Sequence, residues 1–322
     1  MKKFFIAIVA LAAAVACSND DIISIDRQAI GFGNPFVENA TRVAIDPSYS
    51  GNKALTTFNV WGTVTSTTLA TNNTVNVFNG ATCTGNVNMD VWGCDETEYW
   101  IPNCSYNFTA IVDHNSVGND DNNMPTTITV TSDGTRDLLL ATATATTDAN
   151  GAPSQNPVAF TFAHLMSKAH FTFKNTVGSS NYAFQVTDVK VSDLYTSGTY
   201  TIGASTPWSV SAVSTTPLEF GHAVYAEGAS SITNGQTATS NYARTFLPAT
   251  YGDTNKFTVT FTAYMLYKGQ NLGSKNYTIE AKHTFEPSHA YNFVIELGAG
   301  DQIKFKVEDV NGWGEIPDID IP

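Results

Sequence analysis

Cysteine is the residue type in this sequence whose chemistry is most definite, and Cys17, the first of four cysteines, lies in a pattern that predicts acylation. Two lysines near the start are followed by an apolar run, residues 4–14, which is too short to span a membrane. Small residues, 14–16, precede Cys17, and a polar, acidic stretch, 18–21, follows it at once. We therefore expect residues 1–16 to be a signal peptide that is cleaved before Cys17, whose thiol then carries a lipid such as palmitate. The alternative is an ordinary secretory signal that happens to contain a cysteine.

The other three cysteines, Cys83, Cys94 and Cys104, allow one disulfide at most and leave one thiol over. Cys94 and Cys104 are the candidate pair, because a hairpin between them would bring them together. The pairing among the three stays open at this point. A zinc site is not expected, since the sequence has no Cys-x-x-Cys spacing.

Sequence motifs of catalysis are missing: the chain lacks GxSxG, HExxH, a P-loop and a complete GxGxxG. The Asp/Asn-rich residues 113–125 place Asp113, Asn115 and Gly118 at the first, third and sixth positions of an EF-hand loop. However, Met124 stands at the twelfth position, where a bidentate glutamate is needed, so a solvated surface loop is the better interpretation. We assign no catalytic, cofactor-binding or metal-ligating residue, and we expect neither an enzyme nor a cofactor.

Two histidines and two tryptophans are the remaining side chains whose chemistry deserves a hypothesis. His164 and His170 lie on strand-like runs, where a structural role is more common than a catalytic one. Trp92 and Trp208 can stack on sugars if they are exposed, but such aromatic side chains more often fill a core or an interface.

The elements that must position these residues are strands. Charged residues make up only 14% of the chain and Thr, Ser, Asn and Gly are abundant, a mix that favours strands and turns over exposed helices. Apolar and polar residues alternate in residues 257–268 and almost perfectly in residues 303–310. Many short alternating runs, with turns between them and no long amphipathic helix, predict an all-β fold built of sandwiches. The net charge of −13 argues against nucleic acid as a partner, because the chain cannot neutralise a row of phosphates.

The length predicts two domains, because 322 residues are too many for one ordinary sandwich. Residues 148–157 contain two prolines and a glycine and have no apolar periodicity, so they mark the predicted boundary. We expect an N-terminal domain at residues 43–157 and a C-terminal domain with a short tail at residues 158–322. Ahead of them, residues 17–42 combine an acidic spacer with a strand-like apolar run and end in a polar turn.

Several stretches carry a resemblance to a known family. They are the acylation signal around Cys17, EYWIPNCSYNFTAIV at 98–112 with DLLLATA at 137–143, FTFAHLMSKAHFTFKN at 160–175, and FEPSHAYNFVIELGAGDQIKFKVEDVNGW at 285–313. In this order and spacing they resemble the fimbrillin family of the Bacteroides group, which comprises major and minor fimbrial subunits and Mfa-like lipoproteins.

The resemblance implies two tandem transthyretin-like Greek-key β-sandwich domains and export as a lipoprotein to the outer membrane and the cell surface. It also implies that a trypsin-like, arginine-specific protease removes the first strand, so that a strand of a neighbouring subunit fills the hydrophobic groove left behind. The physical basis would be β-augmentation, in which backbone hydrogen bonds supply affinity and alternating pockets supply register.

In this sequence the resemblance implies protease cleavage between Arg42 and Val43, because Arg42 follows the apolar run and precedes the first sandwich strand. Arg27 is the second choice, since a cut there would leave residues 29–36 in place. Both arginines can also be ordinary surface residues. Residues 314–322 are a candidate donor strand, but their prolines limit ladder hydrogen bonds, so a tip, anchor or accessory position is as consistent as a shaft position.

The sequence thus predicts a fimbrial (pilus) subunit that polymerises by protease-triggered donor-strand exchange, in cell adhesion or biofilm. Its expected partners are other fimbrial subunits, the protease, the outer membrane through the lipid, and glycans or proteins on host or bacterial surfaces. The alternative is a surface glycan-binding lipoprotein that does not polymerise. A surface hydrolase with paired carboxylates is a third hypothesis.

Overall fold

The computed structural model describes residues 28–33, 35–37, 55–68, 73–85, 91–214, 216–299 and 302–310. In these residues all the regular elements are β-strands, which confirms the all-β prediction. None of the described residues forms a helix long and apolar enough to cross a membrane. Cys17, Arg27, Arg42, Val43 and the termini 1–16 and 314–322 lie outside the described residues, so what was predicted for them stays a prediction.

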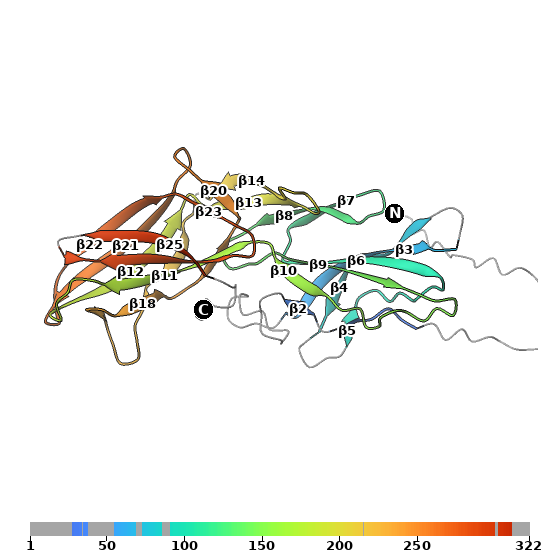
Figure 1. Cartoon of the computed structure of the whole chain (residues 1–322), viewed down its shortest axis with the longest axis horizontal. Coiled ribbons are helices and arrows are strands. Elements are labelled where there is room, and N and C mark those ends of the chain that lie inside the picture. The colour runs from blue at the N-terminus through green and yellow to red at the C-terminus, as the bar shows by residue number, and fades with distance from the viewer. Residues whose placement is uncertain are drawn as a thin grey trace, which may run out of the picture.

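The first sheet has eight strands, and it begins and ends with two short strands that are neighbours in sequence. In sheet order these are β1 (Phe32–Gly33), β5 (Val91–Cys94), β4 (Thr74–Thr84), β3 (Thr57–Ser66), β6 (Cys104–Val112), β9 (Leu139–Thr146), β10 (Thr161–His164) and β2 (Phe36–Val37). β1 pairs with β5 in antiparallel orientation, and β2 pairs with β10 in parallel orientation. The chain from β1 to β2 therefore joins the two edges of this sheet, which forms the right-hand half of the molecule in Figure 1.

The core of the first sheet is rich in aromatic rings. Tyr106, Phe108 and Ala110 alternate along β6 and are all buried, as the alternation in the sequence predicts. Phe58 of β3 and Trp92 of β5 belong to the same apolar cluster. We call this cluster the first core.

The predicted domain boundary after residue 157 does not coincide with a change of core. Val158, Phe160 and Phe162 are fully buried in the first core, and β10 pairs with β9. Residues 148–157 thus connect two neighbouring strands of one sheet. Composition does not separate such a connection from an interdomain linker, because both interrupt regular structure with proline and glycine.

The second core lies between two further sheets, in the left-hand half of Figure 1, and includes Phe171, Phe257 and Phe293. In sheet order one sheet consists of β16 (Ala223–Val224), β18 (Thr237–Ser240), β11 (Ser167–Asn175), β24 (Ala290–Leu297) and β25 (Ile303–Val310), with β19 (Arg244–Phe246) also paired to β11. The other consists of β15 (Leu218–Gly221), β12 (Tyr182–Ser192), β21 (Phe257–Tyr267) and β22 (Gln270–Ala281), with β17 (Ile232–Thr233) also paired to β12. A small two-stranded sheet pairs β20 (Ala249–Tyr251) with β23 (His283–Phe285).

A fourth set of strands is shared by the two halves of the chain. It runs in the order β14 (Trp208–Val213), β13 (Tyr195–Thr201), β8 (Pro125–Thr131) and β7 (Ser116–Asn119), so that β8 and β13 are antiparallel neighbours. A separate apolar cluster that includes Trp61, Leu165 and Leu247 accompanies this sheet. The halves are therefore joined by paired backbone as well as by the connecting chain. Their finer assignment as two transthyretin-like Greek-key domains stays a prediction.

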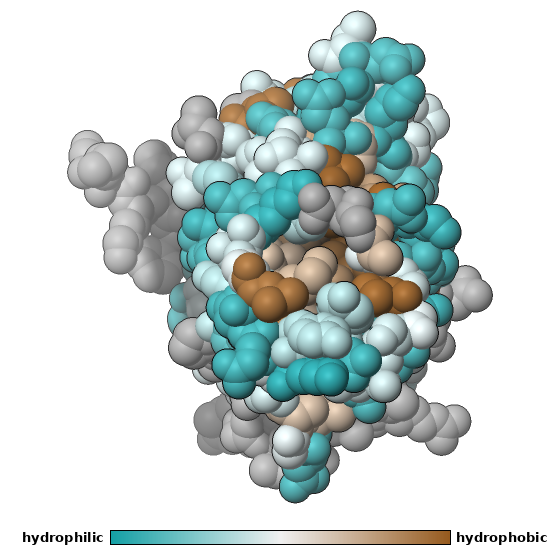
Figure 2. All heavy atoms as spheres, turned by 90° about the vertical axis from the view of Figure 1, so that its left-hand side faces the viewer, coloured by the Kyte–Doolittle hydropathy of each residue, from teal (hydrophilic) through white to brown (hydrophobic). Residues whose placement is uncertain are grey.

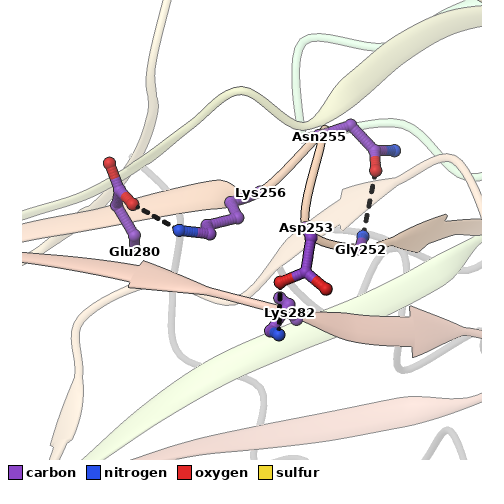
Figure 3. A network of polar contacts seen from close by, with 6 residues as sticks. All are labelled: Gly252, Asp253, Asn255, Lys256, Glu280 and Lys282. Carbon is purple, nitrogen blue, oxygen red and sulfur yellow. Dashed lines mark hydrogen bonds and ion pairs between the residues drawn. The ribbon is translucent and has the colours of Figure 1, made fainter.

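The surface of the second half is mostly polar. Figure 2 looks at the end of the molecule that this half forms, where apolar side chains surround a shallow hollow within a polar rim. Figure 3 shows a loop beside β21, in which Asn255 accepts a hydrogen bond from the Gly252 nitrogen (2.9 Å) and donates one to the Thr250 oxygen (2.9 Å, not drawn). Two exposed ion pairs, Lys256–Glu280 and Lys282–Asp253, lie close to this loop.

Candidate functional site

The first described residues of the chain, 28–33 and 35–37, are inserted between two parts of the first sheet, and we call them the inserted segment. Backbone hydrogen bonds hold the segment on both sides. From donor nitrogen to acceptor oxygen they are Ile30 to Glu98 (2.8 Å), Trp100 to Gln28 (3.1 Å), Gly33 to Val158 (2.8 Å) and Val158 to Gly31 (2.7 Å). Backbone bonds of this kind do not read the sequence, so any extended chain of suitable shape can form them.

Asn156 adds a side-chain clamp to this pairing. Its Oδ1 accepts a hydrogen bond from the Gly31 nitrogen (3.1 Å), and its Nδ2 donates one to the Ala29 oxygen (3.3 Å). The amide therefore offers the segment one acceptor and one donor, as a residue of a neighbouring strand would. This contact, too, is made to backbone atoms only.

Phe32 anchors the inserted segment in the first core, where its side chain is fully buried. Its ring stacks on Phe160, with the centroids 5.4 Å apart and the planes 19° apart. Three further rings approach it edge to face, namely Phe58 at 6.2 Å, Phe78 at 5.5 Å and Phe108 at 5.6 Å between centroids. Such aromatic contacts add to the stabilisation from the buried area itself.

Both neighbours of Phe32 are glycines, and the packing explains why. A Cβ atom on Gly31 would lie 2.9 Å from the Val91 Cγ1 atom, and one on Gly33 would lie 3.3 Å from the Pro157 Cγ atom. Real Cβ atoms are rarely found this close to another side chain. A side chain on Gly31 would therefore need Val91 to shift, and one on Gly33 would need Pro157 to give by a few tenths of an ångström.

The strand β5, on which β1 lies, is held by a disulfide between Cys83 and Cys94. The predicted Cys94–Cys104 disulfide is therefore wrong. Cys83 and Cys94 are direct partners in the antiparallel pairing of β4 and β5, whereas β4 and β3 separate β5 from β6, on which Cys104 lies. Cys104 is a free, buried thiol whose pKa burial raises. The two candidate spacings in sequence are almost equal, so spacing alone did not distinguish the pairs.

The two tryptophans considered for sugar stacking are engaged in packing. Trp92 is buried and stacks on Phe58, with the ring centroids 5.3 Å apart. Trp208 is half-buried, donates its indole N–H to the Leu165 oxygen (2.9 Å) and contacts the Tyr200 ring at 5.3 Å. Neither side chain is a freely exposed aromatic face.

The two histidines on strand-like runs are also buried. His164 Nδ1 lies 2.5 Å from the Asp137 Oδ2 atom, and both side chains are almost fully enclosed. Burial, helped by the positive charge of Lys168, lowers the pKa of His170 to about 4. The described residues contain no group of three or more His, Cys, Asp or Glu side chains placed to hold a metal ion.

The Asp/Asn-rich stretch 113–125 is more regular than the predicted loop, because residues 116–119 form β7 and pair with β8. In the turn that follows, the Asp120 carboxylate accepts hydrogen bonds from the backbone nitrogens of Asn122 (2.8 Å) and Met124 (2.9 Å). The carboxylate therefore serves to shape this turn.

Sequence reasoning located the inserted segment but missed what holds it. Asn156 and Val158 lie far along the chain, Asn156 inside the stretch that composition marks as a linker and Val158 directly after it. Gly31 and Gly33 left a usable signal, since two glycines around one aromatic residue in a strand indicate close approach of other groups.

The sequence matches a known protein family, and the fold is similar to those of solved structures. The family model described as fimbrillin-like matches residues 41–313. The structure is similar to a fimbrial protein from Bacteroides vulgatus, with 18% identity and a TM-score of 0.60 over 88% of this chain and 99% of that chain. It is also similar to a candidate cell adhesion protein from Bacteroides uniformis, with 19% identity and a TM-score of 0.51 over 89% of this chain and 98% of that chain. At such identities the likeness shows the fold alone. No curated protein matches the sequence.

Proposed function

Because this chain belongs to the fimbrillin-like family, we propose that it is a fimbrial (pilus) subunit that polymerises when a strand of a neighbouring subunit replaces its inserted segment. The observation that carries the proposal is the position of that segment, which joins both edges of the first sheet and puts Phe32 into the first core. Its removal would expose two strand edges and an aromatic cavity, both of which a strand from another subunit can cover.

Cleavage between Arg42 and Val43 is the proposed trigger. In the intact chain the inserted segment returns to its site at the high effective concentration of an intramolecular contact. After cleavage it is lost to solution each time it dissociates, and a neighbour's strand can take its place. Burial of Phe32 contributes about 2–3 kcal/mol, and each backbone hydrogen bond contributes about 1 kcal/mol, so the uncut segment opens too rarely for efficient exchange.

The same cut separates the folded body from the lipid on Cys17, because Cys17 lies on the N-terminal side of Arg42. In this proposal the lipid holds the precursor at the outer membrane and the cell surface. The cut subunit is then held by other subunits in the fimbrium. The remaining partners are the arginine-specific or trypsin-like protease and the host or bacterial glycans or proteins contacted in adhesion. The chain acts through assembly and not as an enzyme.

Limited trypsin digestion of the lipid-free chain tests this function. We expect cleavage after Arg42, followed by a ladder of oligomers on native electrophoresis. Arg42→Ala should abolish both, whereas Arg27→Ala, which removes the other candidate site, should abolish neither. A chain that is cut after Arg42 and stays monomeric at high concentration would contradict strand exchange.

A further inference from the structure

Three ionisable residues are buried near the place where the two halves of the chain meet. Asp137 lies just before β9, His164 ends β10, and Lys168 lies on β11. They are 1%, 2% and 3% exposed, in that order, and lysine is rarely enclosed to this extent. The apolar cluster between the halves includes Leu138 and Leu165, the chain neighbours of the first two. Such surroundings make each buried charge costly.

The strand pairing directs the Lys168 side chain towards Asp137. Lys168 and Thr245 are opposite residues in the antiparallel pairing of β11 and β19, so their Cα atoms are about 4.5–5.5 Å apart and their side chains leave the same face. On that face the Thr245 hydroxyl donates a hydrogen bond to the oxygen of Arg136, the residue before Asp137. Ala169, the next residue of β11, belongs to the second core on the other face. The lysine side chain therefore extends to the segment that carries the Asp137 carboxyl group.

His164 is placed to handle protons at this carboxyl group. Its Nδ1 atom lies 2.5 Å from the Asp137 Oδ2 atom. The backbone around it is held on both sides, because the Leu165 nitrogen donates to the Leu138 oxygen (2.9 Å) and the Ser288 hydroxyl donates to the His164 oxygen. The imidazole can therefore give a proton to the carboxyl oxygen, or take one from it, without moving.

We propose that Lys168 and Asp137 become joined by an amide bond, an intramolecular isopeptide crosslink that the chain forms by itself after folding. The amine and the carboxylic acid react in their uncharged forms, which an apolar site favours over an ion pair. Lys168 Nζ forms a bond to Asp137 Cγ, and the bond from Cγ to Oδ2 breaks. His164 passes to Oδ2 the proton that the attacking nitrogen gives up, so that one water molecule leaves and His164 returns to its starting state. The step is a condensation and needs no oxidant or other reactant.

The crosslink would add a covalent bond between the two halves. Without it they are held by the pairing of β8 with β13 and by the connecting chain. The amide would also remove the positive charge of Lys168 that acts on His170, while burial, the larger cause of the low His170 pKa, would remain. The proposal involves neither the inserted segment nor its replacement, so it stands or falls independently of strand exchange.

The intact mass of the lipid-free wild-type chain, measured after reduction of the disulfide, tests the crosslink. We expect this mass to be lower than the mass of the sequence by one water molecule. Lys168→Met, which puts an unbranched apolar side chain into the buried position, and Asp137→Ala should each show the full mass of their sequences. A wild-type chain with the full mass of its sequence would overturn the proposal. This measurement uses no variant, so a variant that fails to fold does not affect it.

Trypsin digestion of the denatured chain locates the lost water. Trypsin does not cut after a lysine whose amine is in an amide, so we expect a fragment that runs from Asp137 through Lys168 to Lys174 and lacks one water. An unlinked chain would instead give the separate fragments 137–168 and 169–174. A succinimide at Asp133-Gly134 would also lose one water, but trypsin would still cut after Lys168. That result would overturn the crosslink.

His164→Gln tests the role of the imidazole. Glutamine can still donate a hydrogen bond to the carboxyl group but cannot transfer a proton, so crosslinking should be about a hundred-fold slower. We expect the wild type to be fully linked when it is first purified. The folded variant should be largely unlinked at that point and should lose water slowly at pH 7, as followed by intact mass. A variant that is already fully linked would overturn the role of His164 and leave the crosslink standing.

Discussion

The two large cores of this protein are closed in different ways. In the second core β21 pairs with β22 along its whole length, and β11 pairs with β24 from Lys168 to Asn175. The first core is closed by β1 and β2, which have two residues each. A strand in a long ladder cannot be replaced without breaking many hydrogen bonds at once. A short segment held by one aromatic ring and a few backbone hydrogen bonds can be replaced more easily.

The comparison shows that the length of the strands that complete a core does not determine how densely that core is packed. Both cores contain dense aromatic packing, so both can be stable. The first core owes part of its packing to a short chain segment, residues 28–33 and 35–37, that can be removed without cutting any other strand. Substitutions that are equivalent in burial should therefore differ in their effect on exchange.

The largest effect is expected for Phe32→Ala, with Phe293→Ala in the second core as its match. Both side chains are fully buried among aromatic rings. Each truncation should lower the free energy of unfolding by about 3–5 kcal/mol, measured by denaturant titration. Only Phe32→Ala should also speed amide hydrogen exchange in residues 28–33. If Phe293→Ala speeds that exchange equally, the inserted segment is not an independent unit.

The second largest effect on stability is expected from the disulfide between Cys83 and Cys94, which joins β4 to β5 beside the inserted segment. The bond closes a short loop, with a sequence separation of 11, and should stabilise the fold by about 3 kcal/mol. Replacing Cys83 and Cys94 by serine should lower stability by about that amount and free β5, on which β1 rests. Hydrogen exchange in residues 28–33 and 91–100 reports the loosening.

Cys104→Ser is the control for this pair, because Cys104 is buried but forms no disulfide. It should leave exchange in the inserted segment close to the wild-type rate. A double serine variant whose inserted segment stays fully protected would show that β5 does not need the disulfide to hold β1.

The two cores also differ in how much of them the sequence predicts. The alternation of Phe171 and Phe173 identifies β11, since the apolar face of a strand is written locally in its sequence. The walls of the inserted segment are not local: Asn156 reaches Gly31 across 125 positions of sequence. No local pattern records such a contact. The Cys83–Cys94 pair was likewise decided by which strands are neighbours in the sheet, which spacing does not reveal.

Acid should lower the free energy of unfolding through a group in the second half of the molecule, His170 of β11. Burial lowers the pKa of His170 from 6.5 to about 4, so between these values the unfolded chain binds a proton that the folded chain does not. Stability is therefore lost as pH falls from about 6.5 towards 4, by about 2 kcal/mol at pH 5. In the wall of the first core, burial and the neighbouring Glu96 raise the pKa of Glu98, which has the opposite sign and favours the folded state in acid.

Thermal unfolding at pH 7 and pH 5 measures the acid effect, with His170→Gln as the matched variant. The variant should lose less stability than the wild type between the two pH values, because its side chain does not titrate. An equal loss in both proteins would place the acid sensitivity at other groups.

The smallest and most selective effect is expected for two asparagines that make the same bonds in different settings. Asn156 binds the backbone of the inserted segment through Gly31 and Ala29, whereas Asn255 binds the backbone of its own loop (Figure 3). Each alanine substitution removes one acceptor and one donor and should cost about 1–2 kcal/mol. The two substitutions should lower stability by similar amounts, but only one of them should change the rate of strand exchange. Without Asn156 the segment keeps Phe32 and its backbone bonds but loses the side-chain clamp, so after cleavage at Arg42 its replacement by another strand should be several-fold faster. Asn255→Ala should leave that rate unchanged, because its bonds close a loop that the exchange never opens. An Asn156→Ala chain that loses stability but exchanges at the wild-type rate would show that the amide stabilises the fold without clamping the segment.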